Sequence, residues 1–220
     1  MIQFRQPAGV ATATTGSLLG QVLGIDGIGF LITAAAAYVT AALHIGSPFS
    51  FIAMLIGFGF LIAISATRNN EALSLLMFYL FTLCEGVGIG PVIGMYIAQG
   101  PSGSAVVVDA ASTTGLGMLT LASIVYLTHF DYRRLSGIAF GALIVLVIAG
   151  FISIFVNFMH PATYSWLVLA VFSLLVLVDF ARIRAGGDNL SAVQLATSIY
   201  LDAINIFLAL LTIFGGRRRD

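Results

Sequence analysis

The chain has 220 residues, of which 60% are hydrophobic and 8% are charged, and its 9 basic and 9 acidic side chains give a formal net charge of zero. A soluble domain carries about 25% charged residues and cannot bury this much apolar surface, so a soluble fold and a disordered chain are both excluded. Without a basic excess, nucleic acid is not an expected partner, and the single cysteine, Cys84, excludes a disulfide framework.

Seven apolar runs follow one another along the chain, each long enough to cross a hydrocarbon layer of about 30 Å as a helix. Because the runs are continuous rather than alternating, they do not fit the strands of a barrel. They predict helices at residues 18–43, 49–66, 72–98, 105–127, 136–158, 164–183 and 191–214. We therefore predict an all-α integral membrane protein, with one domain over 1–220, a short tail at 1–16 and an arginine-rich tail at 215–220.

The arginines fall on alternate linkers between these runs. They lie before the first run and after the second, fourth and sixth, at Arg5, Arg68, Arg133, Arg134 and Arg184, with Arg182 just before the end of the sixth. The positive-inside rule then places the N-terminus and these linkers in the cytoplasm. The arginine cluster at 217–219 does not fit this rule. Either the seventh run crosses fully and places the cluster outside, or it turns back; we favour a full crossing.

Three acids fall inside the predicted spans, where an ionisable group costs at least about 2.5–3.5 kcal/mol and therefore indicates function. Glu85 lies near the middle of the third span, and Asp202 lies near the middle of the seventh. Asp179 lies about one turn inside the cytoplasmic end of the sixth. Asp26 and Asp109 lie nearer to span ends, where we interpret them as interfacial or helix N-terminal acids.

Asp179 and Asp202 lie on consecutive helices that a short linker joins, so a tilted hairpin can bring the two carboxyls together. Two carboxyls within hydrogen-bond reach in a dry site cannot both ionise cheaply, and they share a proton. Such a pair can switch structure near neutral pH. The alternative partner of Asp179 is Arg182, which follows three residues later on the same helix face.

The seventh run carries one small and polar stripe on an otherwise apolar helix. The stripe consists of Ser198, Asp202, Asn205, Ala209 and Thr212. In a bilayer such a stripe must face protein or a water-filled cavity. The stripe therefore predicts that the seventh helix lies at the centre of the bundle.

The third run repeats glycine at every fourth residue, at Gly86, Gly90 and Gly94. Small residues at this spacing allow two helix backbones to approach closely, so we interpret these glycines as packing residues. Pro91 interrupts the same helix and frees a backbone carbonyl near Glu85.

Four segments carry a resemblance to a known family. They are residues 85–91 (EGVGIGP), 129–132 (HFDY), 179–183 (DFARI) and 200–207 (YLDAINIF), the last followed by Leu211, Ile213, Phe214 and Gly215. Together they resemble the Bax inhibitor family of seven-span membrane proteins, in its bacterial branch. The match around Asp202 is the most specific of the four.

The resemblance implies six helices around a central seventh, and a pH-sensitive calcium leak channel rather than an enzyme, in the bacterial cytoplasmic membrane. It implies that Asp179 and Asp202 form the gating pair and that Arg68 latches onto that pair in the closed form. A shared proton and Arg68 would hold the bundle shut, and deprotonation would open it by charge repulsion.

The resemblance also implies a route for calcium, with no permanently bound cofactor. Some bacterial relatives carry a glutamate in the second span, whereas residues 54–59 (MLIGFG) contain none, and Glu85 would take its place. Calcium prefers oxygen ligands. Glu85, Asp202, Asn205 and the carbonyl freed by Pro91 could supply them, with Glu85 and Asp202 as the candidate metal ligands.

Three other functions remain as alternatives. An intramembrane aspartyl protease also places acids on spans six and seven, but residues 198–201 (SIYL) do not match its Gly-x-Gly-Asp motif. A serine-type protease would use Ser102 and His160, although the Gly-Pro-Ser-Gly around Ser102 is typical of a turn. In the third alternative the protein does not transport. It would modulate a membrane-anchored AAA protease or a stress response through exposed segments such as 133–134 and the arginine tail.

Overall fold

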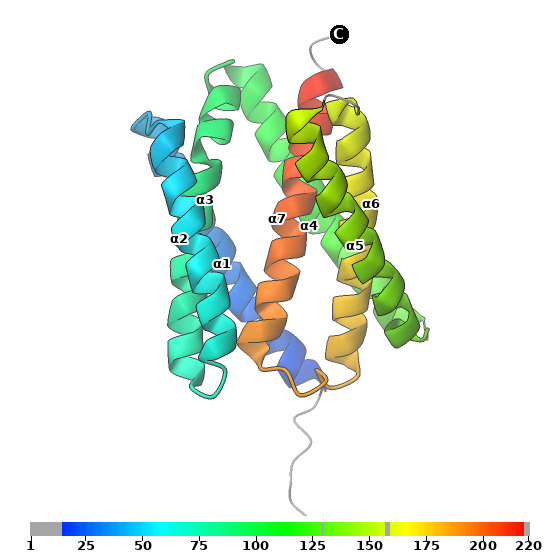
Figure 1. The fold of residues 1–220 in the computed structure, drawn as a ribbon. Helices are drawn as coiled ribbons and strands as arrows, with labels where there is room; N and C mark the ends of the chain where they lie inside the picture. Colours follow the sequence, from blue (N-terminus) through cyan, green and yellow to red (C-terminus); the bar gives the residue numbers. More distant parts are fainter. Residues whose placement is uncertain (1–14, 129, 157–158, 218–220) are drawn as a thin grey trace, which may run out of the picture.

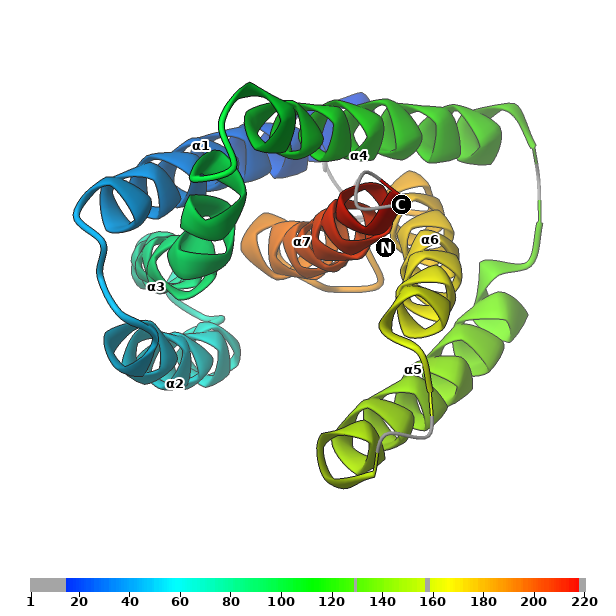
Figure 2. The same ribbon diagram turned by 90° about the horizontal axis from the view of Figure 1, so that it is seen from above.

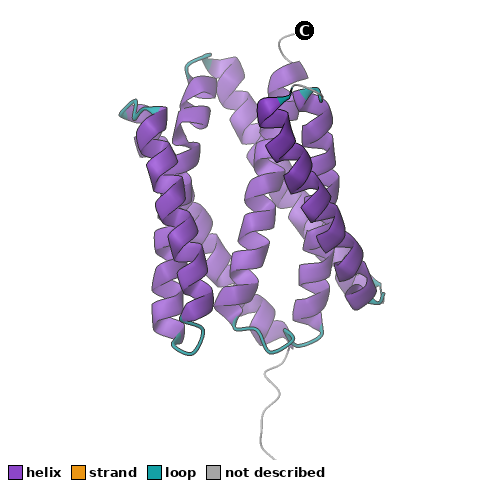
Figure 3. Cartoon of the chain, viewed as in Figure 1, coloured by secondary structure: helices purple, strands orange, loops and turns teal. Residues whose placement is uncertain are grey.

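The computed structural model describes residues 15–128, 130–156 and 159–217, which form seven α-helices and no strand (Figure 3). The helices are α1 (Thr15–Ala42), α2 (Ser47–Ala66), α3 (Glu71–Ile97), α4 (Pro101–Leu127), α5 (Tyr132–Phe155), α6 (Pro161–Arg184) and α7 (Ala192–Arg217). Each is long and apolar enough to cross a membrane. The predicted fold class is therefore confirmed, and every helix ends within about four residues of its predicted boundary.

Local sequence signals set several of the helix starts. Pro48, Pro101 and Pro161 lie in the first turns of α2, α4 and α6, where a missing backbone N–H costs nothing. The Asn70 side chain accepts a hydrogen bond from the Leu73 backbone N–H and so caps α3. Asp131 caps α5 in the same way, through the backbone N–H of Arg133.

The centre of the bundle is α7, as its polar stripe predicts (Figures 1 and 2). It contacts α1, α2, α3, α4 and α6, and it is the most buried of the seven helices described. The surrounding ring is not uniform, because α5 packs on α6 and on no other described helix. Figure 2 shows α5 at the edge of the molecule, with α6 between it and α7.

The ends of the helices alternate between two faces, as the arginine pattern predicts. The start of α1 and the α2–α3, α4–α5 and α6–α7 connections lie at one end of the bundle (Figure 1). The C-terminal end of α7 lies at the opposite end, so this helix runs the full length of the bundle. Arg5, His129, Arg218 and Arg219 lie outside the described residues. Which end faces the cytoplasm stays a prediction.

The glycines of α3 lie where this helix meets α1. A Cβ added at Gly86 would lie 2.5 Å from the carbonyl oxygen of Thr33, and one added at Gly90 would overlap the side chain of Thr40. At Gly94 the nearest atom would be the Ala41 Cβ, at 3.3 Å. The two backbones are therefore in close contact at Gly86 and Gly90, and they separate slightly toward Gly94.

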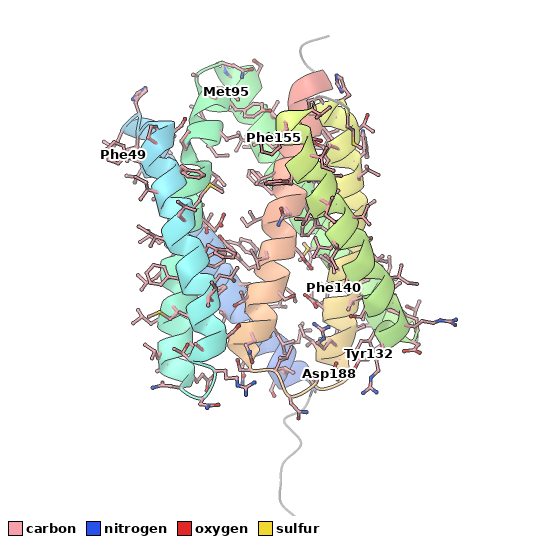
Figure 4. The ribbon with its side chains drawn as sticks, viewed as in Figure 1. Phe49, Met95, Tyr132, Phe140, Phe155 and Asp188 are labelled. Atoms are coloured by element: carbon pink, nitrogen blue, oxygen red, sulfur yellow. The ribbon has the colours of Figure 1, made fainter. Side chains whose placement is uncertain are left out.

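Large apolar side chains cover the outside of the bundle, as expected for a surface in contact with lipid. Figure 4 shows Phe49 and Phe155 near one end of the bundle, on α2 and α5, and both are at least 70% exposed. An apolar surface of this extent would not be stable in water. The exposed residues of the helices therefore define the membrane-facing surface.

Candidate functional site

The two aspartates of the α6–α7 hairpin are buried inside the bundle. Asp179 is 4% exposed and Asp202 is 5% exposed, and each has one carboxyl oxygen, Oδ2, without a hydrogen-bond partner. The two side chains lie close enough to interact electrostatically, although no hydrogen bond joins them among the described residues. The hairpin therefore places two acids, one turn and three turns from its linker, in a single electrostatic site.

Arg182 is the cation of this site. Its Nη1 donates to Asp179 Oδ1 at 2.9 Å, and its Nε lies 3.6 Å from Asp188 Oδ2 in the α6–α7 linker. Asp188 in turn accepts a hydrogen bond of 2.8 Å from the hydroxyl of Tyr132, at the start of α5. Figure 4 shows Tyr132 and Asp188 together at the same end of the bundle. This chain of polar contacts ties α5, α6 and the linker to the buried acid.

The structure therefore combines the two partners that the sequence offers for Asp179. The ion pair with Arg182 is present, and Asp202 lies within electrostatic range of Asp179. Ser198, from the polar stripe of α7, also approaches the Asp179 carboxyl. One guanidinium thus faces two buried carboxyl groups, which leaves the second carboxyl without a cation of its own.

Arg68 occupies a different place from the one implied for a latch. It lies exposed after the end of α2, and no ion pair of the described residues includes it. The guanidinium that contacts the pair here belongs to Arg182. A latching role of Arg68 in another arrangement of the helices stays a prediction.

Asp26 is a third buried acid, and its interpretation as an interfacial residue is wrong. It lies about three turns inside α1, is 2% exposed, and has neither carboxyl oxygen in a hydrogen bond. It interacts electrostatically with Asp179. The sequence offered one signal, because the first apolar run begins at residue 18, about two turns before the acid. Asp109 is exposed, in agreement with the prediction.

Glu85 lies on α3 and not on the α6–α7 hairpin that carries the pair. It is half-buried, and its electrostatic neighbour on α7 is Tyr200, not Asp202. The Tyr200 hydroxyl lies 2.5 Å from Thr33 Oγ1, which is also 2.9 Å from the carbonyl oxygen of Thr82. Among the described residues, no group of three or more acidic, histidine or cysteine side chains is arranged to hold a metal ion. Calcium ligation by Glu85 and Asp202 stays a prediction.

The outer part of the polar stripe lines a cavity of about 280 Å³ between α5, α6 and α7. Asn205, Ala209 and Thr212 contribute to its wall, together with Tyr164 and Ser165 of α6. The Asn205 amide donates to the carbonyl oxygen of Leu201 at 2.8 Å, which leaves its own carbonyl oxygen available. This part of the stripe therefore faces a partly polar space between helices, which is open at the surface because Val147 and Thr212 of its wall are exposed.

Ser102 and His160 do not form a nucleophile and base. Ser102 Oγ lies exposed in the first turn of α4 and donates to the carbonyl oxygen of Gln99 at 3.4 Å. His160 Nδ1 accepts from the backbone N–H of Ala162 and caps α6. Each side chain thus has a local structural role, at a water-exposed helix start.

The fold and the site define a class of protein: a seven-helix membrane protein with a central polar helix and buried acids at its last hairpin. Comparison with known sequences places the chain within that class. The profile of the family described as "Inhibitor of apoptosis-promoting Bax1" matches residues 15–219. The chain belongs to this Bax inhibitor family.

Its relatives include bacterial membrane proteins of similar length. An uncharacterised membrane protein of Vibrio cholerae is 31% identical over 84% of this chain and 83% of its own length. An uncharacterised protein of Pseudomonas aeruginosa is 30% identical over 96% and 90% of the two chains. A third relative, "Modulator of FtsH protease YccA" of Escherichia coli, is 27% identical over 86% and 84%.

Proposed function

We propose that this protein is a pH-sensitive calcium leak channel whose gate is the site formed by Asp179, Asp202 and Arg182. The observation that supports the proposal most strongly is the burial of two carboxyl groups, Asp179 and Asp202, that interact with each other. The guanidinium of Arg182 contacts Asp179 at the linker end of this pair. With one proton on the pair, Arg182 faces a single buried carboxylate, in addition to the exposed Asp188 of the linker. Loss of that proton leaves an uncompensated charge in a poorly solvated place, which favours separation of the helices and entry of water.

The route of the ion would follow the polar stripe of α7. Asp202 lies at its middle, and Asn205 and Thr212 continue it along the cavity toward the far end of the bundle. Carboxylate, amide and hydroxyl oxygens are the ligands that a hard cation prefers. Glu85 interacts with Tyr200 and not with Asp202 in the present arrangement, so it would join this route only after the helices move.

The test is calcium flux into liposomes that contain the purified protein, measured with an encapsulated dye from mildly acidic to mildly alkaline pH. We expect the flux to rise with pH in the unaltered protein, because deprotonation destabilises the closed site. In Asp179→Asn and Asp202→Asn the flux should lose its pH dependence, because each amide keeps the shape of the protonated acid and cannot titrate.

Asp109→Asn is the matched control, because Asp109 is an exposed acid on α4. It should retain the pH dependence of the unaltered protein. If both pair variants also retain it, the gating proposal is wrong. If the flux rises on acidification instead, protonation of Asp179 and loss of its ion pair with Arg182 would be the opening step, in place of charge repulsion.

A second candidate function is the modulation of a membrane-anchored protease without transport. The observation that favours it is the similarity to the relative described as a modulator of the FtsH protease. Affinity purification of the tagged chain from its native membrane, in mild detergent, would then recover a membrane protease at near-stoichiometric yield. Such recovery from a protein that shows no flux in liposomes would favour modulation over the channel.

A further inference from the structure

We infer that the cavity between α1 and α4 is a binding site for an amphiphilic amine, with Asp26 as the residue that recognises the ammonium group. The cavity has a volume of about 630 Å³, within the range of ligand-binding sites. Its walls come from α1, α3, α4, α6 and α7 and are almost entirely apolar. The cavity borders the α6–α7 site, because Phe180 and Ala203 line it and Asp26 interacts electrostatically with Asp179. Binding of an amine beside Asp26 does not require that the protein is a channel.

The polar groups of the cavity wall leave Asp26 as the recognition element. Thr33 and Thr114 also line the cavity, but the Thr33 hydroxyl is engaged with Thr82 and Tyr200, and Thr114 donates to the carbonyl oxygen of Ala110. Tyr38 lies about 18 Å from Asp26 along α1, and its hydroxyl carries no charge. Asp26 is the only acidic or basic residue that the described part of the chain contributes to the wall. Both its oxygens lack a partner and are fully buried, so the side chain would turn toward the cavity when a ligand binds. A buried carboxyl without partners is unfavourable, and an ammonium donor would satisfy it.

The position of Asp26 gives the ligand a direction. The wall residues of α1 run from Leu23 and Asp26 to Tyr38, so the cavity extends about 18 Å along the helix from the acid. Asp26 lies near the end of the cavity that Phe180 and Met118 also line, and Ile97 and Tyr38 lie at the other end. A cationic head beside Asp26 with a linear apolar tail therefore matches the shape.

The cavity also has an entrance from the bilayer. No residues of α1 and α4 are in direct backbone contact, although both helices line the cavity. Figure 2 shows α1 and α4 along the same side of α7, with no other helix outside them. Leu23 and Tyr38 of α1 line the cavity and are also exposed, so the cavity is open to the membrane between these two helices. Gly115 lies exposed on the α4 side of this entrance.

The test uses three probes with the same tail and different heads: dodecylamine, dodecanol and dodecanoate. The full chain is placed in nanodiscs, and its unfolding temperature is followed by far-UV circular dichroism at increasing probe concentration, because a ligand of the folded state stabilises it. We expect dodecylamine to raise the unfolding temperature in a saturable way, at concentrations about tenfold lower than dodecanol. Dodecanoate should have no saturable effect.

Two variants separate a specific site from a general effect of amphiphiles. Asp26→Asn should bring the response to dodecylamine close to the response to dodecanol. Gly115→Phe places a ring at the entrance, where a Cβ has no atom within 4 Å, and should abolish saturable binding. Gly137→Phe is its matched control on α5, at an exposed glycine that is equally free of neighbours, and should bind as the unaltered protein does.

If dodecylamine and dodecanol raise the unfolding temperature equally, the inference is overturned, because the cavity would then accept any alkyl chain without recognition by Asp26. An unchanged dodecylamine response in Gly115→Phe would overturn it as well. If Asp26→Asn does not fold, the three probes and the glycine pair still decide between these outcomes.

Discussion

Gly86→Ala is expected to lower the free energy of unfolding by about 1–3 kcal/mol, the usual consequence of adding a methyl group to a closely packed interface. The new Cβ would meet the backbone carbonyl oxygen of Thr33 at 2.5 Å, and a backbone atom cannot move without displacing α1. Thr33 also holds Tyr200 of α7, so a displaced α1 would disturb the core beyond the α1–α3 contact. The measurement is unfolding of the purified protein in mixed micelles by titration with SDS, followed by circular dichroism.

Two other glycines provide the controls for this prediction. Gly94→Ala would place its Cβ 3.3 Å from that of Ala41, a contact that small shifts can relieve, so its effect should be smaller. Gly59→Ala on α2 meets no atom within 4 Å, and it should be neutral or stabilising by up to about 1 kcal/mol, because alanine favours helix more than glycine does. Equal effects at all three positions would mean that helix propensity, and not the α1–α3 contact, determines the result.

The elements and the central helix follow from the sequence because they depend on local properties. An apolar run of about 20 residues specifies a spanning helix whatever surrounds it, and the stripe from Ser198 to Thr212 specifies which helix needs a protein environment on one face. Proline and cap residues then set the ends to within a few residues. These signals do not require knowledge of any neighbouring helix.

The environment of single acids could not be obtained in the same way. Counting residues gives the depth of Asp26 in its span, but its burial depends on α1 turning that face toward α4, α6 and α7. The composition of α1 is nearly even around the helix, so no face is marked as internal. The same limit applies to α5, whose apolar residues cover all sides and do not show that it packs only on α6. For the hairpin pair, the sequence places Asp179 and Asp202 on neighbouring helices. It does not decide whether the Arg182 side chain points toward the buried Asp179 or toward solvent.

The contact of Arg182 with Asp179 predicts a second large effect of a substitution on stability. Arg182→Ala is expected to destabilise the protein by about 3 kcal/mol, because it removes the only cation among the described residues that is in contact with the buried Asp179. The value lies at the lower end for a buried ion pair, since the Arg182 side chain keeps 22% of its surface exposed. The loss should appear in the same SDS titration as for the glycine variants.

The double variant Arg182→Ala/Asp179→Asn identifies the cause. An amide needs no counter-charge, so the double variant should recover most of the stability that the single variant loses, and the cycle should give a coupling of about 1–3 kcal/mol. Arg134→Ala removes an exposed arginine at the start of α5 and should change stability by less than about 0.5 kcal/mol. If the double variant is as unstable as Arg182→Ala, the arginine stabilises the hairpin through Asp188 and Tyr132. The buried acid would then lack the balancing charge on which the closed gate depends.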